Sequence, residues 1–413
     1  MRSRTGIRRS NWPGSPLLRG VYVPRTMDAA AFAMATYGIP LLALATTGSA
    51  ALTGLAFALE WAPRLMAFTV AGALVDRHGT TRVFRLAATA RAVLVLAAAM
   101  LLGAQTGGLG ETVTVMALAA GTGVLTEFSY IAAETAGATA SRAAGATAHR
   151  VQSVLLGIDQ TATLAGPALA GLLLAHTGAT GMLAATAVFS LLAATLAPRH
   201  HSDRHAATPA AVRQGLRSGW RTLRALPALG WLVAGLTLSN LAVGVLQAAV
   251  PVIVVQQFGH SSTDVGLLWS AAASASLIAI SLCRRAIDAY GLWQVGAVAA
   301  TITASACLTL TAAHTYLTYL ALIALFMAGE GGMTVVLRTL RSHLIPADTF
   351  GSTLAVTILL LLLPFPAAGL LVAVMPPAQL GHAITACAAL QAIGLAVAFT
   401  RLRTLPGLLP RAA

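Results

Sequence analysis

Several ionisable residues that could carry chemistry lie within long apolar segments of the chain, among them Glu60, Arg64, Glu127, Asp159 and Glu330. If these segments cross a membrane, the charges are costly and mark function by default. A carboxylate at such a depth can exchange protons, pair with an arginine, or bind a charged group of a substrate. Which of these roles applies depends on the elements that position the five side chains.

Local spacing suggests some pairings directly. Glu60 lies about 15 Å into its apolar segment, at a helical rise of about 1.5 Å per residue. Arg64 follows one turn later on the same face, so an internal ion pair is one interpretation, and a substrate or coupling role is equally open. Asp28 comes three residues after Arg25, and this spacing predicts an ion pair between them at the membrane interface. Glu134 lies close to the end of its segment and is not retained as a site.

The composition indicates what surrounds these charges. Hydrophobic residues make up 57% of the 413 residues and charged residues only 9%, whereas a soluble domain carries about 25% charged residues. The 38 glycines and 17 prolines are compatible with membrane helices, in which both residue types are frequent. These values exclude an ordinary soluble protein and predict a polytopic membrane protein.

Twelve apolar segments reach the roughly 20 residues that a membrane-spanning helix needs. A polar interval separates the first six from the last six. The candidate spans lie near residues 24–46, 50–75, 82–104, 112–136, 151–175 and 180–197, and then near 228–255, 264–284, 292–313, 316–337, 351–375 and 381–400.

The distribution of arginine predicts the orientation of these spans. Arginine supplies all 26 basic residues, and the formal net charge of +14 could indicate nucleic-acid binding. With the N-terminus inside, however, the outer loops contain no arginine, and only Arg64 and Arg91 lie well inside spans, away from the cytoplasmic ends. The positive-inside rule therefore predicts cytoplasmic termini and a lipid bilayer as the partner of this chain, with no nucleic acid bound.

These observations divide the chain into five parts. The expected parts are a basic cytoplasmic arm (1–23), a six-helix bundle (24–197), a cytoplasmic linker (198–227), a second six-helix bundle (228–400) and a cytoplasmic tail (401–413). The linker begins with a His/Arg cluster at 199–205, for which a solvated segment is favoured over a metal site. Apolar residues at helical spacing, each followed by an arginine, predict an amphipathic interfacial helix over 212–224.

A short motif occurs at the matching place in each half. Its first copy contains Gly72, Asp76, Arg77, Gly79 and Arg82, and its second copy contains Asp288 and Gly291. The Asp-x-x-Gly element thus recurs with an offset of 212 residues, as expected of a transporter built from parallel repeats. A tight turn needs the glycine, and the aspartate can cap a helix or pair with an arginine.

The first copy resembles the signature of the major facilitator superfamily between its second and third helices. The resemblance implies an all-α membrane protein with twelve transmembrane helices in two six-helix bundles. It also implies that the aspartate and arginines latch the cytoplasmic ends of the two halves, a latch that breaks as the transporter switches. In the second copy, Arg284 and Gln294 replace the expected glycine and arginine, so that latch is degenerate. An ordinary capped turn is the alternative.

A second resemblance covers the fifth span. Gly157, Gly166, Pro167 and Gly171 resemble the antiporter signature of the superfamily, with Ala170 in place of one glycine of the usual pair. In the family this pattern accompanies exporters. Helix packing alone is the alternative, because small residues let helices approach closely.

The first two spans resemble the macrolide-efflux and siderophore-exporter branch. Ile39-Pro-Leu-Leu and Glu60-Trp-Ala-Pro63 carry this likeness. Many proton-coupled exporters of the superfamily have an arginine in the middle of the fourth helix, where this chain has Glu127 and Glu134. Their proton relay is therefore not carried over. The resemblance also implies that Glu127 and Glu330 face a central cavity, because the first, fourth, seventh and tenth helices line it.

The expected function is export of a small amphipathic organic compound, drug-like or natural-product-like, by alternating access and proton antiport. We expect a monomer in the bacterial inner membrane, with no cofactor, no metal and no enzymatic step. An importer or uniporter of the same fold and a non-transporting membrane sensor remain open alternatives.

Overall fold

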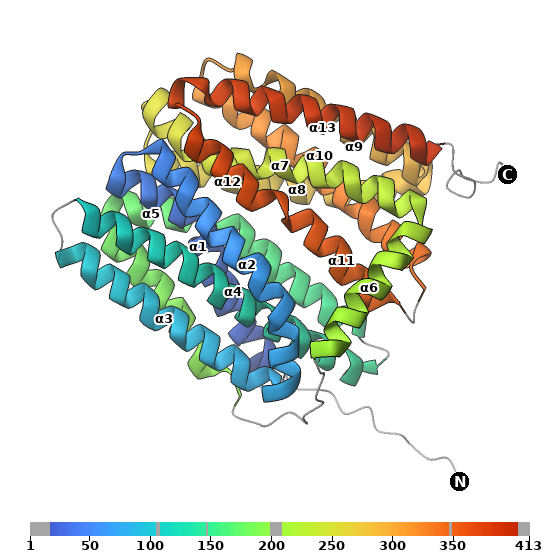
Figure 1. The fold of residues 1–413 in the computed structure, drawn as a ribbon, viewed down its shortest axis with the longest axis horizontal. Coiled ribbons are helices and arrows are strands. Elements are labelled where there is room, and N and C mark those ends of the chain that lie inside the picture. The colour runs from blue at the N-terminus through green and yellow to red at the C-terminus, as the bar shows by residue number, and fades with distance from the viewer. Residues whose placement is uncertain (1–16, 105–107, 146–147, 199–208, 347–348, 404–413) are drawn as a thin grey trace, which may run out of the picture.

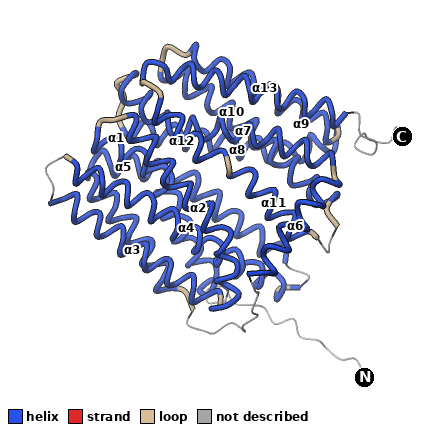
Figure 2. Tube along the Cα trace, in the orientation of Figure 1, coloured by secondary structure: helices blue, strands red, loops and turns tan. Residues whose placement is uncertain are grey.

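The computed structural model describes residues 17–104, 108–145, 148–198, 209–346 and 349–403. All secondary structure in these ranges is helical (Figure 2). The first half contains α1 (Val23–Thr47), α2 (Ala50–His78), α3 (Thr80–Ala104), α4 (Leu109–Ala143) and α5 (Ala148–Leu196). The second half contains α7 (Pro227–Val252), α8 (Ser262–Tyr290), α9 (Leu292–Thr309), α10 (Tyr316–Leu344), α11 (Phe350–Leu362), α12 (Pro364–Val374) and α13 (Leu380–Arg403).

Five shorter or peripheral helices complete the part of the chain that the structure describes. They are η1 (Leu18–Tyr22), η3 (Ile253–Gln257), η4 (Leu310–Ala312), η5 (Pro377–Gln379) and α6 (Pro209–Ala225). The first helix thus begins six residues before the expected start at 24, because Leu17, Val21 and Tyr22 pack on a small apolar cluster that contains Val151 and Leu155. Helix α6 covers the predicted amphipathic segment. The His/Arg cluster at 199–205 lies outside the described residues.

The described helices are consistent with twelve crossings of a bilayer when the long helix α5 counts as two. Ten are long and apolar enough to span, and α2, which is bent by 53°, makes an eleventh. Helix α5 has 49 residues and would be about 73 Å long if straight, more than twice the roughly 30 Å hydrocarbon core. Gly178 breaks it with φ 70° and ψ −173°, so α5 is two spans. Conversely, α11 and α12 form one span that is interrupted before Pro364.

Helices α1–α5 pack mainly on one another, as do α7–α13 (Figure 1). Two helix pairs carry most of the contact between these halves: α5 lies against α8, and α2 lies against α12. Because consecutive spans are antiparallel, the turns after α2, α4, α8 and α10 gather at one end. Arg77, Arg142, Arg285 and Arg341 lie near the C-terminal ends of these four helices, and we call this end, where α6 also lies, the arginine end.

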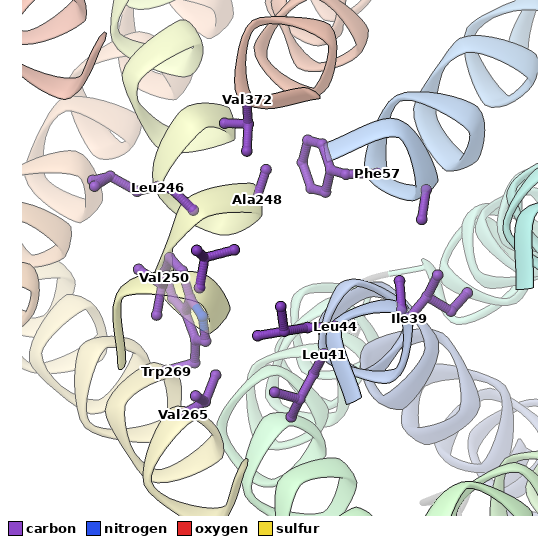
Figure 3. Packing of buried hydrophobic residues seen from close by; sticks show 14 of the residues in the cluster. Ile39, Leu41, Leu44, Phe57, Leu246, Ala248, Val250, Val265, Trp269 and Val372 are labelled. Atoms are coloured by element: carbon purple, nitrogen blue, oxygen red, sulfur yellow. The ribbon is translucent and has the colours of Figure 1, made fainter. Parts of the chain in front are cut away.

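The halves meet closely at the opposite end. A Cβ atom on Gly54 of α2 would lie 2.5 Å from the backbone nitrogen of Ala373 in α12, so only glycine fits there. Gly171 of α5 lies against Gly266 of α8 in the same way. Apolar side chains of α1, α2, α7, α8 and α12 fill the space between them (Figure 3). Close backbone contact and a shared apolar core therefore hold the halves together at this end.

Candidate functional site

A cavity of about 600 Å³ lies between the halves, towards the arginine end. Its first-half wall carries nearly all of the charge, and its second-half wall is apolar apart from one arginine. The first-half wall includes Arg25, Asp28, Phe32, Arg64, Phe68, Glu127, Tyr130, Glu134, Asp159 and Gln160. The second-half wall includes Arg338, Gly351, Leu354, Ala355, Ile358 and Leu362. A compound held here would meet ionic groups on one side and hydrocarbon on the other.

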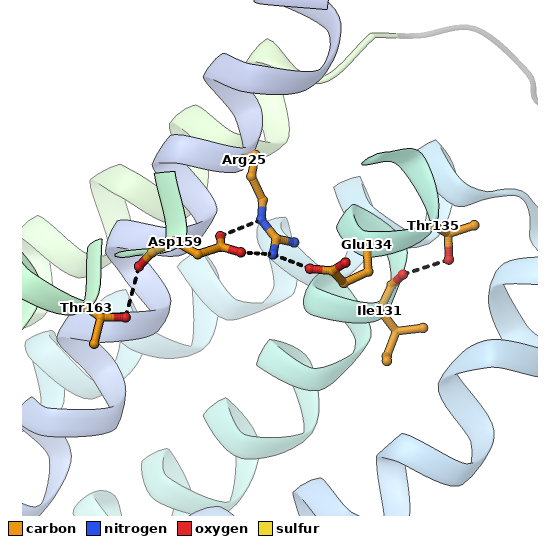
Figure 4. Close-up of polar contacts among 6 residues, drawn as sticks. All are labelled: Arg25, Ile131, Glu134, Thr135, Asp159 and Thr163. Carbon is orange, nitrogen blue, oxygen red and sulfur yellow. Dashed lines mark hydrogen bonds and ion pairs between the residues drawn. The ribbon is translucent and has the colours of Figure 1, made fainter. Parts of the chain in front are cut away.

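Arg25 of α1 joins two carboxylates on this wall (Figure 4). Its Nε and Nη2 donate to the two oxygens of Asp159 at 2.8 and 2.7 Å, and Nη2 also donates to Glu134 at 2.6 Å. The Arg25 side chain is only 5% exposed, whereas Glu134 and Asp159 are 51% and 34% exposed. The cluster therefore combines one shielded cation with two carboxylates that face the cavity. With all three groups ionised, it has one negative charge in excess.

Arg64 of α2 forms a second, more deeply buried ion pair. Its Nε donates to Glu127 of α4 at 2.8 Å, and its guanidinium lies between the rings of Phe32 and Trp61, 4.6 and 4.4 Å from their centroids. The predicted Glu60–Arg64 ion pair is wrong. Glu60 is buried within electrostatic range of Arg64, but its Oε2 atom has no hydrogen-bond partner among the described residues.

Close packing of α2 against α4 explains that correction. A Cβ atom on Gly123 of α4 would overlap the carbonyl oxygen of Glu60, so the glycine lets the two helices touch. This approach brings Glu127, one turn after Gly123, against Arg64. A tertiary contact thus overrides the local i, i+4 pairing, which contributes only about 0.2–0.5 kcal/mol.

Asp28 also has a different partner from the one that its position predicts. It accepts a hydrogen bond from Arg91 of α3 at 2.6 Å, and not from Arg25. Arg91 is completely buried and also donates to Ser190 and Ser129 at 2.9 and 3.1 Å. An enclosed guanidinium needs a counter-charge and several acceptors, and these contacts join α1, α3, α4 and the second part of α5.

The expectation that Glu330 faces the cavity is wrong. Its carboxylate is buried inside the second half, where it accepts hydrogen bonds from Ser239 of α7 and Gln391 of α13. Neighbouring glycines explain this orientation, since Cβ atoms on Gly329 and Gly331 would collide with α9 and α8, respectively. With those two faces pressed against neighbours, Glu330 is turned towards α7 and α13.

A sequence model of the Major Facilitator Superfamily matches residues 25–362. The chain belongs to this superfamily. Comparison with curated proteins finds no match.

Solved structures of other major facilitator proteins share this arrangement. A bacterial homologue of the iron transporter ferroportin, in an inward-facing state, superposes with a TM-score of 0.73 at 15% identity, covering 93% of this chain and 98% of that one. The inward-open xylose transporter XylE from E. coli superposes with a TM-score of 0.69 at 14% identity, covering 94% of this chain and 96% of that one. A peptide transporter bound to alafosfalin gives 0.70 at 14% identity, covering 97% of each chain. At these identities the likeness extends to the fold alone.

The superfamily motif forms two equivalent turns. Gly79 and Gly291 have φ values of 86° and 87°, which favour glycine, and their N–H groups donate to Val75 and Ile287 at 2.8 and 2.9 Å. A Cβ atom on Gly72 would meet open space. Asp76, Arg77, Arg82 and Asp288 are exposed, and none of them forms an ion pair with a described side chain. The latch therefore stays a prediction.

The glycines of the fifth span serve different contacts. A Cβ atom on Gly166 would collide with Ala33 of α1, and one on Gly171 would collide with Ser262 and Gly266 of α8. The carbonyl of Pro167 lies against Gly266, whereas Gly157 has open space beside it. Three of the four signature residues thus support the close packing of α5 on its neighbours. This geometry agrees with the helix-packing alternative and leaves the antiporter interpretation untested.

Several residues of the site were not selected from the sequence. Arg25 and Glu134 lie near the ends of their expected spans. There, the positive-inside rule accounts for an arginine, and exposure to solvent accounts for a carboxylate. Arg338 of α10 lies at the arginine end for the same reason. Arg91 offered a usable signal, because it and Arg64 are the arginines that lie well inside the expected spans, away from their ends. A buried arginine requires a counter-charge, and Asp28 supplies it.

Proposed function

We propose that this major facilitator protein exports a small amphipathic organic compound in exchange for protons, by alternating access and without a chemical step. The Arg25 cluster carries this proposal. Two cavity-facing carboxylates share one guanidinium, and the resulting negative charge can be cancelled by one proton or by one positive group of a substrate. If both cannot occupy the cluster together, binding of one releases the other, which is the requirement for antiport.

The shape of the cavity supports an amphipathic substrate. A positive group would lie at Glu134 and Asp159, and a hydrocarbon body would lie along Leu354, Ile358 and Leu362 of α11. A metal ion is less well supported, although some solved structures of the same fold belong to metal transporters. Both oxygens of Asp159 and one of Glu134 are already occupied by Arg25.

Closure at one end supports an inward-facing state. The positive-inside rule assigns the arginine end, towards which the cavity lies, to the cytoplasm. Between the cavity and the opposite end, Trp61 of α2 stacks on Phe365 of α12 at 4.2 Å, and Tyr37 of α1 lies 5.4 Å from Trp269 of α8. Switching would separate these aromatic pairs and bring the Asp76 motif into its latch. The fifth-span pattern favours export, whereas an importer or uniporter would share the rest.

Proteoliposome transport provides the test. Vesicles containing the full chain should move at least one compound from a panel of apolar amines, and an imposed pH gradient should accelerate that movement several-fold. Transport that ignores the gradient would contradict antiport and favour a uniporter. Movement of no compound in the panel would favour the sensor. The Glu111→Gln variant alters a carboxylate at the opposite end of α4, outside the cavity, and should behave like the wild type.

A further inference from the structure

The cavity between the halves carries charge on both of its walls. On the second-half wall, the charged residue is Arg338 of α10, whose side chain is exposed. Within the described residues, no carboxylate forms an ion pair with Arg338. The helices that follow it, α11, α12 and α13, contain no acidic residue. The second half therefore presents an unneutralised cation to the cavity.

A second arginine lies next to Arg338 on α10. Arg341 comes about one helical turn later, and residues at this spacing are neighbours on a helix surface. Arg341 is only 8% exposed, and its Nε and Nη2 atoms have no hydrogen-bond partner among the described residues. The charge of Arg338 acts on it and repels it. A buried guanidinium without a counter-charge is costly, so an anion beside Arg338 would stabilise both arginines.

The first-half wall has the opposite sign. Arg25 shares its guanidinium between Glu134 and Asp159, which leaves one negative charge in excess when all three groups are ionised (Figure 4). The same cavity is lined by the apolar side chains of Leu354 and Ile358 of α11. A compound in the cavity can therefore meet a negative group on one wall, a positive group on the other, and hydrocarbon from α11.

The carboxylates of the protein that lie closest to hand are already engaged. Each carboxylate of the cavity wall is paired with an arginine of the first half: Glu134 and Asp159 with Arg25, Glu127 with Arg64, and Asp28 with Arg91. Glu330, on the same helix as Arg338, is turned into the second half, where Ser239 and Gln391 donate hydrogen bonds to it. The anion that Arg338 lacks is therefore best supplied by a ligand.

We infer that Arg338 binds a carboxylate of the transported compound, which is therefore a zwitterion with an apolar body. This inference rests on the proposed function, which places a positive group of the substrate at Glu134 and Asp159. The planar guanidinium of arginine matches a carboxylate through two parallel hydrogen bonds. Arg341 is not part of the cavity wall, and it acts through its charge by raising the positive potential at Arg338.

Equilibrium binding to the purified full chain in lipid nanodiscs tests the carboxylate. The probes are ω-amino acids of increasing chain length, their methyl esters, and the diamines of the same length, so that only the charge at one end changes. The wild type should bind the best-fitting ω-amino acid about tenfold or more tightly than its methyl ester, the value of one hydrogen bond to a charged group. Equal binding of the two would overturn the carboxylate site and leave the amine site of the proposed function intact. Binding of none of the probes would contradict the proposed function, and this inference with it.

Two substitutions of Arg338 distinguish a specificity-determining residue from a structural or gating one. Arg338→Gln should lose the preference for the ω-amino acid and bind the methyl ester as the wild type does, which also shows that the variant is folded. Arg338→Glu should reverse the preference, so that the diamine binds most tightly. Arg285→Gln, which removes an exposed arginine of α8 outside the cavity wall, is the matched control and should keep the wild-type preference. If Arg338→Gln weakens all three probes equally, or leaves the preference unchanged, Arg338 does not bind the substrate carboxylate and the inference is refuted.

Discussion

Replacing Glu127 by glutamine should lower the free energy of unfolding by about 3–5 kcal/mol, the usual cost of leaving one partner of a buried ion pair without its counter-charge. Arg64 and Glu127 are both almost fully buried, with side chains 7% and 2% exposed. The rings of Phe32 and Trp61 both lie against the guanidinium, which limits its movement. The nearby carboxylate of Glu60 can compensate in part, which places the single variant at the lower end of that range.

The Glu60→Gln/Glu127→Gln double variant should therefore lose more stability than Glu127→Gln, because Arg64 then has neither carboxylate. The assay is chemical unfolding of the purified full chain in mixed micelles, followed by tryptophan fluorescence. Replacing the ion pair by apolar residues, as in Arg64→Met/Glu127→Leu, should recover most of the loss. Unfolding of both glutamine variants within about 0.5 kcal/mol of the wild type, the range of neutral surface changes, would refute this account of the pair.

Three further perturbations test other parts of the structure. Gly79→Ala should lower the free energy of unfolding by about 1–3 kcal/mol, because a φ of 86° strains a residue that has a side chain. Gly72→Ala, where a Cβ atom meets open space, should change this free energy very little. Equal effects of the two variants would contradict the assigned turn. Asp28→Asn should cost about 3–5 kcal/mol because it leaves a completely buried guanidinium uncompensated, and a neutral result would dismiss that ion pair. Gly266→Val should force α8 away from α5 and open the end opposite the arginine end. A Leu44→Cys reporter should then react faster with thiol reagents than it does without Gly266→Val. An unchanged rate would show that the contact of α5 with α8 does not close that end.

The sequence predicts the fold well because each span carries its own signal. About 20 apolar residues identify a span, and the arginines identify the side on which each turn lies, so neither inference requires knowledge of a tertiary contact. The Asp-x-x-Gly repeat is also visible in the sequence. In the structure, its two glycines, Gly79 and Gly291, adopt the same left-handed φ at equivalent turns. The η1 turn before α1 was missed because Leu17 and Val21 are apolar residues within an arginine-rich segment, and only their packing partners make them helical.

The candidate site was predicted in its residue types and not in its pairings. Arg25 and Asp159 are 134 residues apart, and Arg64 and Glu127 are 63 apart, so spacing along one helix carries no information about either pair. Local rules favoured Arg64 with Glu60, and close helix approach at Gly123 reversed that choice. Such pairs are decided by which helices contact each other and by where along the helix axes the contact lies.

Glu330 illustrates a different limit. Its place on the tenth span predicted a cavity-facing carboxylate by analogy with the superfamily, but helix rotation decides the direction of a side chain. In this chain the glycines around it press α10 against α8 and α9. A regular pattern of small residues indicates close packing without naming the partner helix, and the partner determines which residue faces the cavity.

Exchange and gradient-driven transport in the same proteoliposomes measure the role of the Arg25 cluster most directly. For a compound that the wild type transports, Glu134→Gln/Asp159→Asn should abolish the acceleration by a pH gradient, because the carboxylates that take up the proton are gone. Exchange of labelled for unlabelled compound should persist at a measurable rate, which also shows that the variant is folded. If the double variant keeps full gradient-driven transport, the Arg25 cluster does not couple the proton to the substrate.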